Sequence, residues 1–167
     1  MPDRLEEGLP AMGCKQCEGK LVSLLYYRDW AQRSTAKFSS VNTTFEKLED
    51  NDSKTALSCS KCSRIMNKYK ITAGTSNKLD VCVNCDEAWI DKDEWGYLKS
   101  LNLADNFTKI FTDQWQSAIR KEEFDSLALG RLIDEVGEDN ANKAKDVREW
   151  LSRVKNKSAI LHFLARD

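Results

Sequence analysis

The sequence predicts an α+β protein in which a small β-hairpin unit, held by cysteines, precedes a C-terminal helical bundle. Two observations lead to this prediction. Two C-x-x-C pairs enclose two segments of strand character with a turn composition between them, which is typical of a metal-stabilised hairpin. After residue 97 the chain contains neither cysteine nor proline, and its apolar residues recur with helical periodicity. We therefore divide the 167 residues into three regions, 1–53, 54–97 and 98–167.

The first region contains a lone C-x-x-C pair, Cys14 and Cys17, followed by the longest apolar run of the chain. We interpret this run as a buried strand over 20–27, because it is far too short to cross a bilayer. A polar stretch rich in serine, threonine and asparagine follows. We expect one or two strands in this region.

The second region contains the strongest motif, two C-x-x-C pairs separated by 19 residues. Each pair can place two sulfurs on one side of a tight turn, about 2.3 Å from a shared ion, and zinc accepts such a tetrahedral thiolate set. We predict strands over 65–72 and 78–83, with Gly74 in the turn between them. A hairpin that joins two cysteine turns is a zinc ribbon, in which the ion stabilises a core too small to fold alone. The predicted ligands of one structural zinc ion are Cys59, Cys62, Cys82 and Cys85.

The third region shows four amphipathic segments. Apolar residues share one face over 107–121, 126–136 and 141–155, and Ser158 can cap a final short helix. Gly137 is a typical helix stop after the second of these segments. Four apolar stripes can bury one another, so we expect a small helical bundle.

The residues around the last cysteine pair resemble a known family. Segment 79–94 begins with Leu-Asp and carries a set of residues in register with the family pattern: Cys82, Cys85, Trp89, Asp91 and Glu94. It resembles the second cysteine turn of the transcription factor IIB-type (TFIIB-like) zinc ribbons, L-D-x-C-P-x-C-x-G-x-W-L-D-x-G-E. The resemblance covers only residues 57–97, and it implies a structural zinc ion on the same four cysteines.

Two kinds of departure from the family pattern fall within the cysteine turns. Ser60 and Val83 replace the usual prolines, and Asp86 and Glu87 replace the usual glycines. Aspartate tolerates the left-handed backbone conformation better than most other non-glycine residues. We therefore expect the second turn to form, whereas Ser63, which follows the first pair, suits this conformation less well.

The lone pair Cys14 and Cys17 resembles a first cysteine turn, C-x-x-C-x-x-x-L, so residues 14–53 can be a degenerate half-ribbon. No cysteine or histidine lies between residues 18 and 58 to complete a site locally. The pair can consist of free thiols packed in the core, or it can form half of a zinc site that a second subunit completes in a homodimer. It can also be a redox or metal-sensing pair, or compete with the other cysteines for their ion.

Few residues of the chain are candidates for catalysis. The single histidine, His162, lies between apolar residues near the C-terminus and is interpreted as a surface or core residue. Four thiolates leave no open position on zinc for a water molecule. Nucleotide-binding and zinc-protease motifs are absent from the sequence. We expect a non-enzymatic protein.

The charge pattern leaves two functional hypotheses. The net charge of −1 provides no global attraction to nucleic acid or anionic lipid. Residues 54–85 carry six basic and one acidic side chain and include Tyr69, whereas 86–94 carry five acidic and one basic. The first hypothesis is an adaptor whose charges orient a protein partner, with Trp115 and Trp150 either in the helical core or in a binding groove. The second is a nucleic-acid-binding, transcription-related factor with a basic ribbon face on which Tyr69 stacks a base.

The N-terminal sequence lacks the basic and apolar segments of a secretory signal. Three C-x-x-C pairs without such a signal indicate reduced thiols rather than disulfides. We therefore expect a cytoplasmic protein without a membrane segment.

Overall fold

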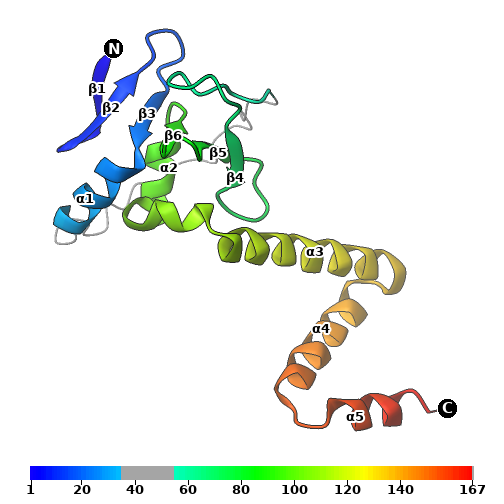
Figure 1. Ribbon diagram of the computed structural model, residues 1–167. Helices are drawn as coiled ribbons and strands as arrows, with labels where there is room; N and C mark the ends of the chain where they lie inside the picture. The colour runs from blue at the N-terminus through cyan, green and yellow to red at the C-terminus, as the bar shows by residue number, and fades with distance from the viewer. Residues whose placement is uncertain (35–54, 167) are drawn as a thin grey trace. The chain divides into compact units, whose positions relative to one another are not determined.

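The computed structural model describes residues 1–34 and 55–166. The chain divides into two compact units, unit 1 (Met1–Arg120) and unit 2 (Lys121–Asp167). Unit 1 contains a six-stranded antiparallel sheet with several helices, and unit 2 contains helices (Figure 1). The predicted α+β class is confirmed. Within the described residues, no helix combines the length and the apolar character needed to cross a membrane.

The sheet of unit 1 draws its strands from both the first and the second sequence region. Its order is β1-β2-β3-β6-β5-β4, and all neighbouring strands are antiparallel. The strands are β1 (Pro2–Glu6), β2 (Leu9–Gly13), β3 (Lys20–Ser23), β4 (Asn67–Lys70), β5 (Lys78–Cys82) and β6 (Glu87–Ile90). Strands β3 and β6 pair in the centre, from Lys20 opposite Ile90 to Ser23 opposite Glu87. The two sequence regions therefore share one sheet.

The hairpin predicted between the cysteine pairs is present. Strands β4 and β5 lie within the predicted ranges 65–72 and 78–83 and pair with Tyr69 opposite Leu79. Gly74 in the connecting turn has a φ of 74°, a value that glycine adopts without steric cost. Strand β6 then adds a third strand beside β5.

The two faces of the sheet have different surroundings because side chains alternate along each strand. Val22 and Ala88 belong to the main core, whereas their neighbours Leu21 and Trp89 belong to a second cluster around the cysteines. Three helices pack against the face of the sheet that bears Val22 and Ala88 and complete the main core: α1 (Leu24–Ser34), α2 (Glu94–Ser100) and the 3-10 helix η1 (Ala104–Phe111). The sheet thus separates a helix-covered face from a cysteine-bearing face.

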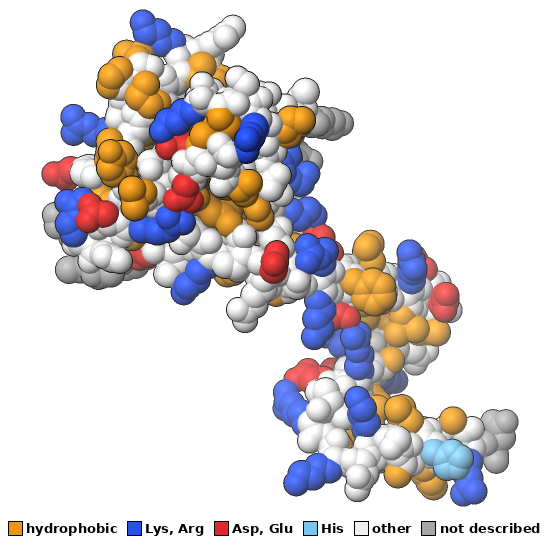
Figure 2. Space-filling model, viewed as in Figure 1, with side chains coloured by type: hydrophobic (Ala, Val, Ile, Leu, Met, Phe, Trp, Pro, Cys, Tyr) orange, Lys and Arg blue, Asp and Glu red, His pale blue; other side chains and the backbone are white. Residues whose placement is uncertain are grey.

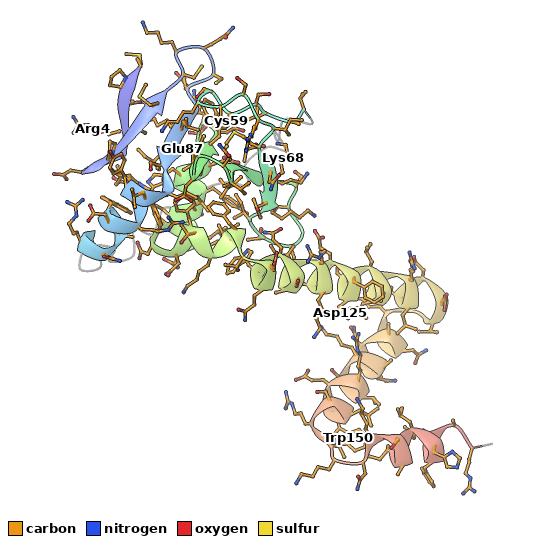
Figure 3. The ribbon with its side chains drawn as sticks, in the orientation of Figure 1. Arg4, Cys59, Lys68, Glu87, Asp125 and Trp150 are labelled. Carbon is orange, nitrogen blue, oxygen red and sulfur yellow. The ribbon has the colours of Figure 1, made fainter. Side chains whose placement is uncertain are left out.

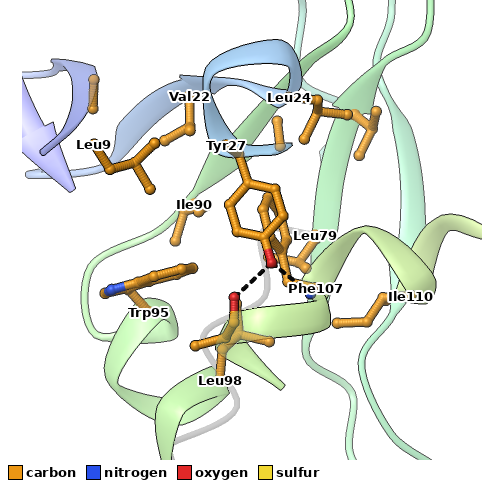
Figure 4. Close-up of a cluster of buried hydrophobic side chains, with 14 of the residues drawn as sticks. Leu9, Val22, Leu24, Tyr27, Leu79, Ile90, Trp95, Leu98, Phe107 and Ile110 are labelled. Atoms are coloured by element: carbon orange, nitrogen blue, oxygen red, sulfur yellow. Dashed lines mark hydrogen bonds between the residues drawn. The ribbon is translucent and has the colours of Figure 1, made fainter. Parts of the chain in front are cut away.

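Tyr27 joins α1 to η1 inside the main core (Figure 4). Its hydroxyl donates a hydrogen bond to the carbonyl oxygen of Ala104 at 2.7 Å and accepts one from the N–H of Phe107 at 3.2 Å. Its ring meets the ring of Phe107 edge to face, with centroids 4.2 Å apart. Burial raises the pKa of Tyr27 to about 12. The neutral phenol is therefore the form that the core favours.

The strand predicted over 20–27 is wrong in its second half, because α1 begins at Leu24. Leu24 and Tyr27 are buried three residues apart, whereas Leu25 and Tyr26 between them are exposed. This spacing is that of a helix with one face on the core. A short apolar run fits a strand and a buried helix equally well, so the sequence pattern did not separate the two.

Helices occupy the predicted third region, but their limits differ from the predicted ones. After η1, the helices are α3 (Asp113–Val136), α4 (Glu138–Arg153) and α5 (Lys157–Leu164). Helix α3 is continuous where the sequence pattern indicated two segments, 107–121 and 126–136. The predicted stop is confirmed, since α3 ends just before Gly137, which has a φ of 80°.

The apolar stripes of unit 2 are buried less than a bundle requires. Among its described residues, Ala141 is the only buried apolar residue. Val147, Trp150 and Leu161 are 43%, 52% and 50% exposed. For Val147 and Trp150 the composition of α4 explains this, because charged and polar side chains predominate in that helix and leave only a narrow apolar stripe. Unit 2 therefore presents apolar side chains at its surface.

Candidate metal centre

Four cysteine sulfurs converge on the cysteine-bearing face of the sheet. Figure 3 labels one of these residues, Cys59, near Glu87. The ligand atoms of Cys59, Cys62, Cys82 and Cys85 all lie within 4.8 Å of one another. The sulfurs of Cys62 and Cys82 are 3.6 Å apart. Cys59 and Cys82 are buried, and the other two are half-buried. The structure therefore brings together the four residues that the spacing of the sequence selects.

Backbone hydrogen bonds close the turn that carries the first pair. The N–H of Cys59 donates to the carbonyl oxygen of Arg64 at 2.8 Å, and the N–H of Ser63 donates to the carbonyl oxygen of Cys59 at 2.8 Å. Ser63 adopts a left-handed conformation with a φ of 58°, and Asp86, at the same place after the second pair, has a φ of 55°. Both turns thus form without the usual glycine.

The sheet itself fixes the second pair. Cys82 is the last residue of β5 and lies opposite Glu87, the first residue of β6. Cys85 lies in the short connection between these two strands. Because β6 also pairs with β3, the second pair is anchored to the centre of the sheet.

Apolar side chains surround the sulfurs. Leu21 and Met66 are buried against the cysteines, and Trp89 packs beside them. The indole N–H of Trp89 donates to Oδ1 of Asp91 at 2.6 Å, which fixes the ring. Trp89 and Asp91 are two of the residues that carry the family resemblance. In this structure Trp89 packs against the cysteine cluster, and Asp91 holds its indole ring.

Polar contacts link the two cysteine turns. The ammonium group of Lys61 donates to the carboxylate of Glu87, which is 4% exposed. This hydrogen bond raises the pKa of Lys61 above its ordinary value. Arg64 in the first turn donates to the side-chain oxygen of Asn84 in the second. Sequence reasoning missed these supports, since it counted Lys61 and Glu87 only as members of a basic and an acidic stretch.

The surroundings of Cys85 disfavour its thiolate form. Hydrogen bonding with Cys62, followed by burial, raises the pKa of Cys85 to about 12. A divalent cation reverses this preference, because it binds thiolates and releases their protons. Four sulfurs that approach one another closely in an apolar setting fit a thiophilic ion with tetrahedral coordination.

Cys14 and Cys17 are separate from this cluster. They lie in the loop between β2 and β3, just before Lys20, and Lys20 pairs with Ile90 at the end of β6. The four-cysteine cluster lies near Glu87, at the start of β6. Cys17 is exposed and Cys14 is only partly buried. The alternative of a core-packed pair is therefore wrong, whereas competition for the ribbon ion stays a prediction. The shared site in a homodimer and the redox pair stay predictions.

Hydrogen bonds within its own loop favour ionisation of the Cys14 thiol. The backbone N–H groups of Cys17 and Gln16 hydrogen-bond to it, with a further contribution from the Cys17 side chain. These contacts lower the pKa of Cys14 below its ordinary value. The loop thus favours a thiolate through its own backbone.

Part of the basic stretch is engaged within unit 1. Lys68 donates to Oδ2 of the buried Asp80 at 3.0 Å, on the cysteine-bearing face. Tyr69 is partly buried against the main core, with its ring centroid 5.4 Å from that of Phe111. The sequence could have predicted that Asp80 lies on the face opposite the main core, because it alternates with apolar residues along β5. His162 is exposed on α5.

Comparisons of the chain with protein-family models, with curated proteins and with solved structures gave no match.

Proposed function

We propose that this protein is a non-enzymatic zinc-binding protein that acts as an interaction module, with one structural zinc ion held by its four clustered cysteines. The convergence of the four sulfurs carries the metal part of this proposal. Cys59, Cys62, Cys82 and Cys85 would hold the ion, which when bound cross-links the two cysteine turns. Four sulfur ligands complete a tetrahedral zinc site and leave no position for a reactive water.

We also propose that residues 57–97 form a zinc ribbon of the TFIIB type. The antiparallel β4-β5-β6 strands and the two cysteine turns support this assignment. So does the position of Trp89 over the cysteine cluster. The metal then has a structural role, because an ion that binds only the folded arrangement of the two cysteine turns stabilises the sheet to which their strands belong.

The metal site is tested by the substitution Cys82→Ser. We expect this variant to lose the ribbon zinc and to lower the free energy of unfolding by about 3 kcal/mol or more, because a buried ligand is removed from the ion. Zinc content and chemical denaturation measure the two effects. Val83→Ser is the matched control, since it places the same residue at a neighbouring position that is 70% exposed. A Cys82→Ser protein with full zinc content and unchanged stability would contradict the proposal.

Exposed apolar side chains on unit 2 support the interaction role. Large hydrophobic residues with at least 41% of their surface exposed occur on all three of its helices: Phe124, Leu127, Val136, Val147, Trp150, Leu161, Phe163 and Leu164. Figure 2 shows apolar side chains at the surface of this unit, among lysines and arginines. Exposed apolar surface that gathers in one part of a protein often marks an interaction site.

A groove between α3 and α4 adds a second feature to this surface. It has a volume of about 770 Å³ and lies entirely within unit 2. Its apolar lining includes Leu129 and Leu132, and Lys145 and Glu149 are among its charged residues. Arg148 and Asp125, also in the lining, form an ion pair at 2.6 Å that bridges the two helices. An apolar floor with charges of both signs suits a protein partner better than a nucleic acid.

The interaction role is tested with Trp150→Glu. We expect a wild-type bait to capture a defined protein from nuclease-treated cell extract, and Trp150→Glu to reduce that capture at least about tenfold because a charge replaces exposed apolar contact area. Asn142→Glu is the control, since it places the same carboxylate at another exposed position of α4. Equal capture by both variants would contradict the assignment of this surface as the binding site. Gel shifts that show salt-sensitive binding of DNA or RNA would instead support the nucleic-acid hypothesis.

A further inference from the structure

The lone cysteine pair has the same backbone turn as the ribbon pair. The N–H of Cys14 donates to the carbonyl oxygen of Gly19 at 2.9 Å, and the N–H of Glu18 donates to the carbonyl oxygen of Cys14 at 3.1 Å. In the turn of Cys59, the same two hydrogen bonds occur at the same sequence offsets. Glu18 has a φ of 59°, one degree from the corresponding Ser63. Cys14 and Cys17 therefore lie on a turn with the same backbone as the first ribbon turn, and the described residues provide no second cysteine turn that faces it.

Contacts with β6 and the segment after it hold this turn in place. Gly19 is packed so closely on Trp89 that a Cβ atom there would lie 2.4 Å from a carbon of the indole ring. Glu18 pairs with Lys92 just beyond β6. The conformation is thus supported by tertiary structure, and it does not depend on a ligand.

The two sulfurs lack further ligands within the described chain. Among the described residues, only the four ribbon cysteines form a group of three or more potential metal ligands. Residues 35–54, outside the described part, contain no cysteine or histidine. Zinc requires two more donors beyond Cys14 and Cys17 to complete a tetrahedron.

We propose that Cys14 and Cys17 form half of a second zinc site, which the same pair from another copy of this chain completes in a homodimer. Four thiols lose their protons to solvent, and four sulfur–zinc bonds form on one ion. This inference goes beyond the proposed function and does not depend on the ribbon site.

The exposure of the turn suits this arrangement. Residues 15–18 are all exposed, and the loop that joins β2 to the start of β3 lies at the top of Figure 1. A two-fold axis through the ion brings two identical loops together, so each copy contributes the same surface. Lys15 is exposed within the turn, and its positive charge favours a centre that four thiolates make negative. A second copy of the chain therefore supplies the two missing thiolate ligands, in a symmetric arrangement around the ion.

The test uses the full chain, kept reduced and loaded with zinc, and measures zinc per chain together with native mass. We expect a dimer with three zinc ions per two chains, two in the ribbons and one shared. The double variant Cys14→Ser/Cys17→Ser is expected to be a monomer with one zinc per chain, held by the four ribbon cysteines, and to unfold at a lower temperature than the zinc-bridged dimer. Gln16→Ser, which changes the same turn without removing a sulfur, should behave like the wild type.

Three outcomes separate this proposal from its competitors. A wild-type monomer with one zinc per chain would overturn it, as would a double variant that keeps its dimeric mass and all of its zinc. Two reactive thiols per chain in the zinc-loaded wild type would also overturn it, in favour of a redox pair. A wild-type dimer with a single zinc per two chains would support the shared site while contradicting the ribbon zinc.

Discussion

At the scale of single residues, the cysteine turns of this protein use left-handed backbone without glycine. Glu18, Ser63 and Asp86 each follow a C-x-x-C pair and have φ values of 59°, 58° and 55°. In the first two turns, the N–H of this left-handed residue donates a hydrogen bond to the carbonyl oxygen of the first cysteine of the pair. For an L-residue other than glycine, this conformation costs roughly 1–2 kcal/mol. The cost is tolerated because the turn positions the sulfurs.

Ser63→Gly should therefore stabilise the zinc-loaded protein. We expect a gain of about 0.5 kcal/mol, because the relief of strain at φ 58° exceeds the additional chain entropy that glycine brings to the unfolded state. Chemical denaturation measures the change. Ser60→Gly makes the same exchange in the same turn at a position without a positive φ, so it should lower stability. A loss at both positions would show that backbone strain at Ser63 is negligible.

The hydroxyl of Tyr27 supports a second prediction at this scale. Tyr27→Phe should lower the free energy of unfolding by about 1–3 kcal/mol, because the buried carbonyl of Ala104 and the N–H of Phe107 both lose their partner. Tyr26→Phe is the control, since that side chain is 57% exposed. Denaturation curves of both variants at neutral pH give the comparison. Equal effects of the two substitutions would contradict the role assigned to the buried hydroxyl.

The raised pKa of Tyr27 adds a pH dependence with a defined sign. Its contribution is complete below the ordinary tyrosine pKa of about 10, because the phenol is then neutral in both states. Between pH 10 and the folded-state pKa of about 12, ionisation favours the unfolded chain, and the contribution is lost. The stability difference between wild type and Tyr27→Phe should therefore narrow over this interval. A constant difference up to pH 12 would contradict it.

At the scale of secondary structure elements, local patterns predicted some elements well. The hairpin of β4 and β5 and the helix stop at Gly137 follow from turn chemistry, which depends on neighbouring residues. The transition from β3 to α1 at Leu24 could not be predicted, because an apolar run has the same appearance in both elements. The pairing of β3 with β6 could not be predicted either, since it joins segments more than 60 residues apart.

At the candidate site, too, features set by neighbouring residues could be predicted, whereas contacts between distant segments could not. Cysteine spacing selects the four clustered residues because two ligands in one turn are a local geometric requirement. The supports are distant in sequence: Lys61 meets Glu87 26 residues away, and Leu21 reaches the cysteines from another strand. No local pattern marks such contacts. Sequence analysis therefore found the ligands and missed the residues that hold them.

At the scale of the whole molecule, the two units differ in how their structure is stabilised. Unit 1 has an extensive buried core with several aromatic contacts and, on the proposed function, a zinc ion that cross-links its cysteine turns. In the described part of unit 2, one apolar residue is buried and eight large ones are exposed. Helices with so little buried surface open easily. Unfolding of the chain should therefore not be a single cooperative transition.

Hydrogen exchange with and without a zinc chelator tests this difference. We expect the amides of β5 and β6 to exchange slowly in the zinc-loaded protein and at least about tenfold faster after chelation, because metal release opens the cysteine turns that flank these strands. The amides of α4 and α5 should exchange quickly under both conditions, since their side chains are largely exposed. Adding zinc back after chelation should restore protection in β5 and β6 only. Slow exchange in β5 and β6 despite complete zinc removal would mean that the main core alone maintains the sheet, and the ion would then have no structural role.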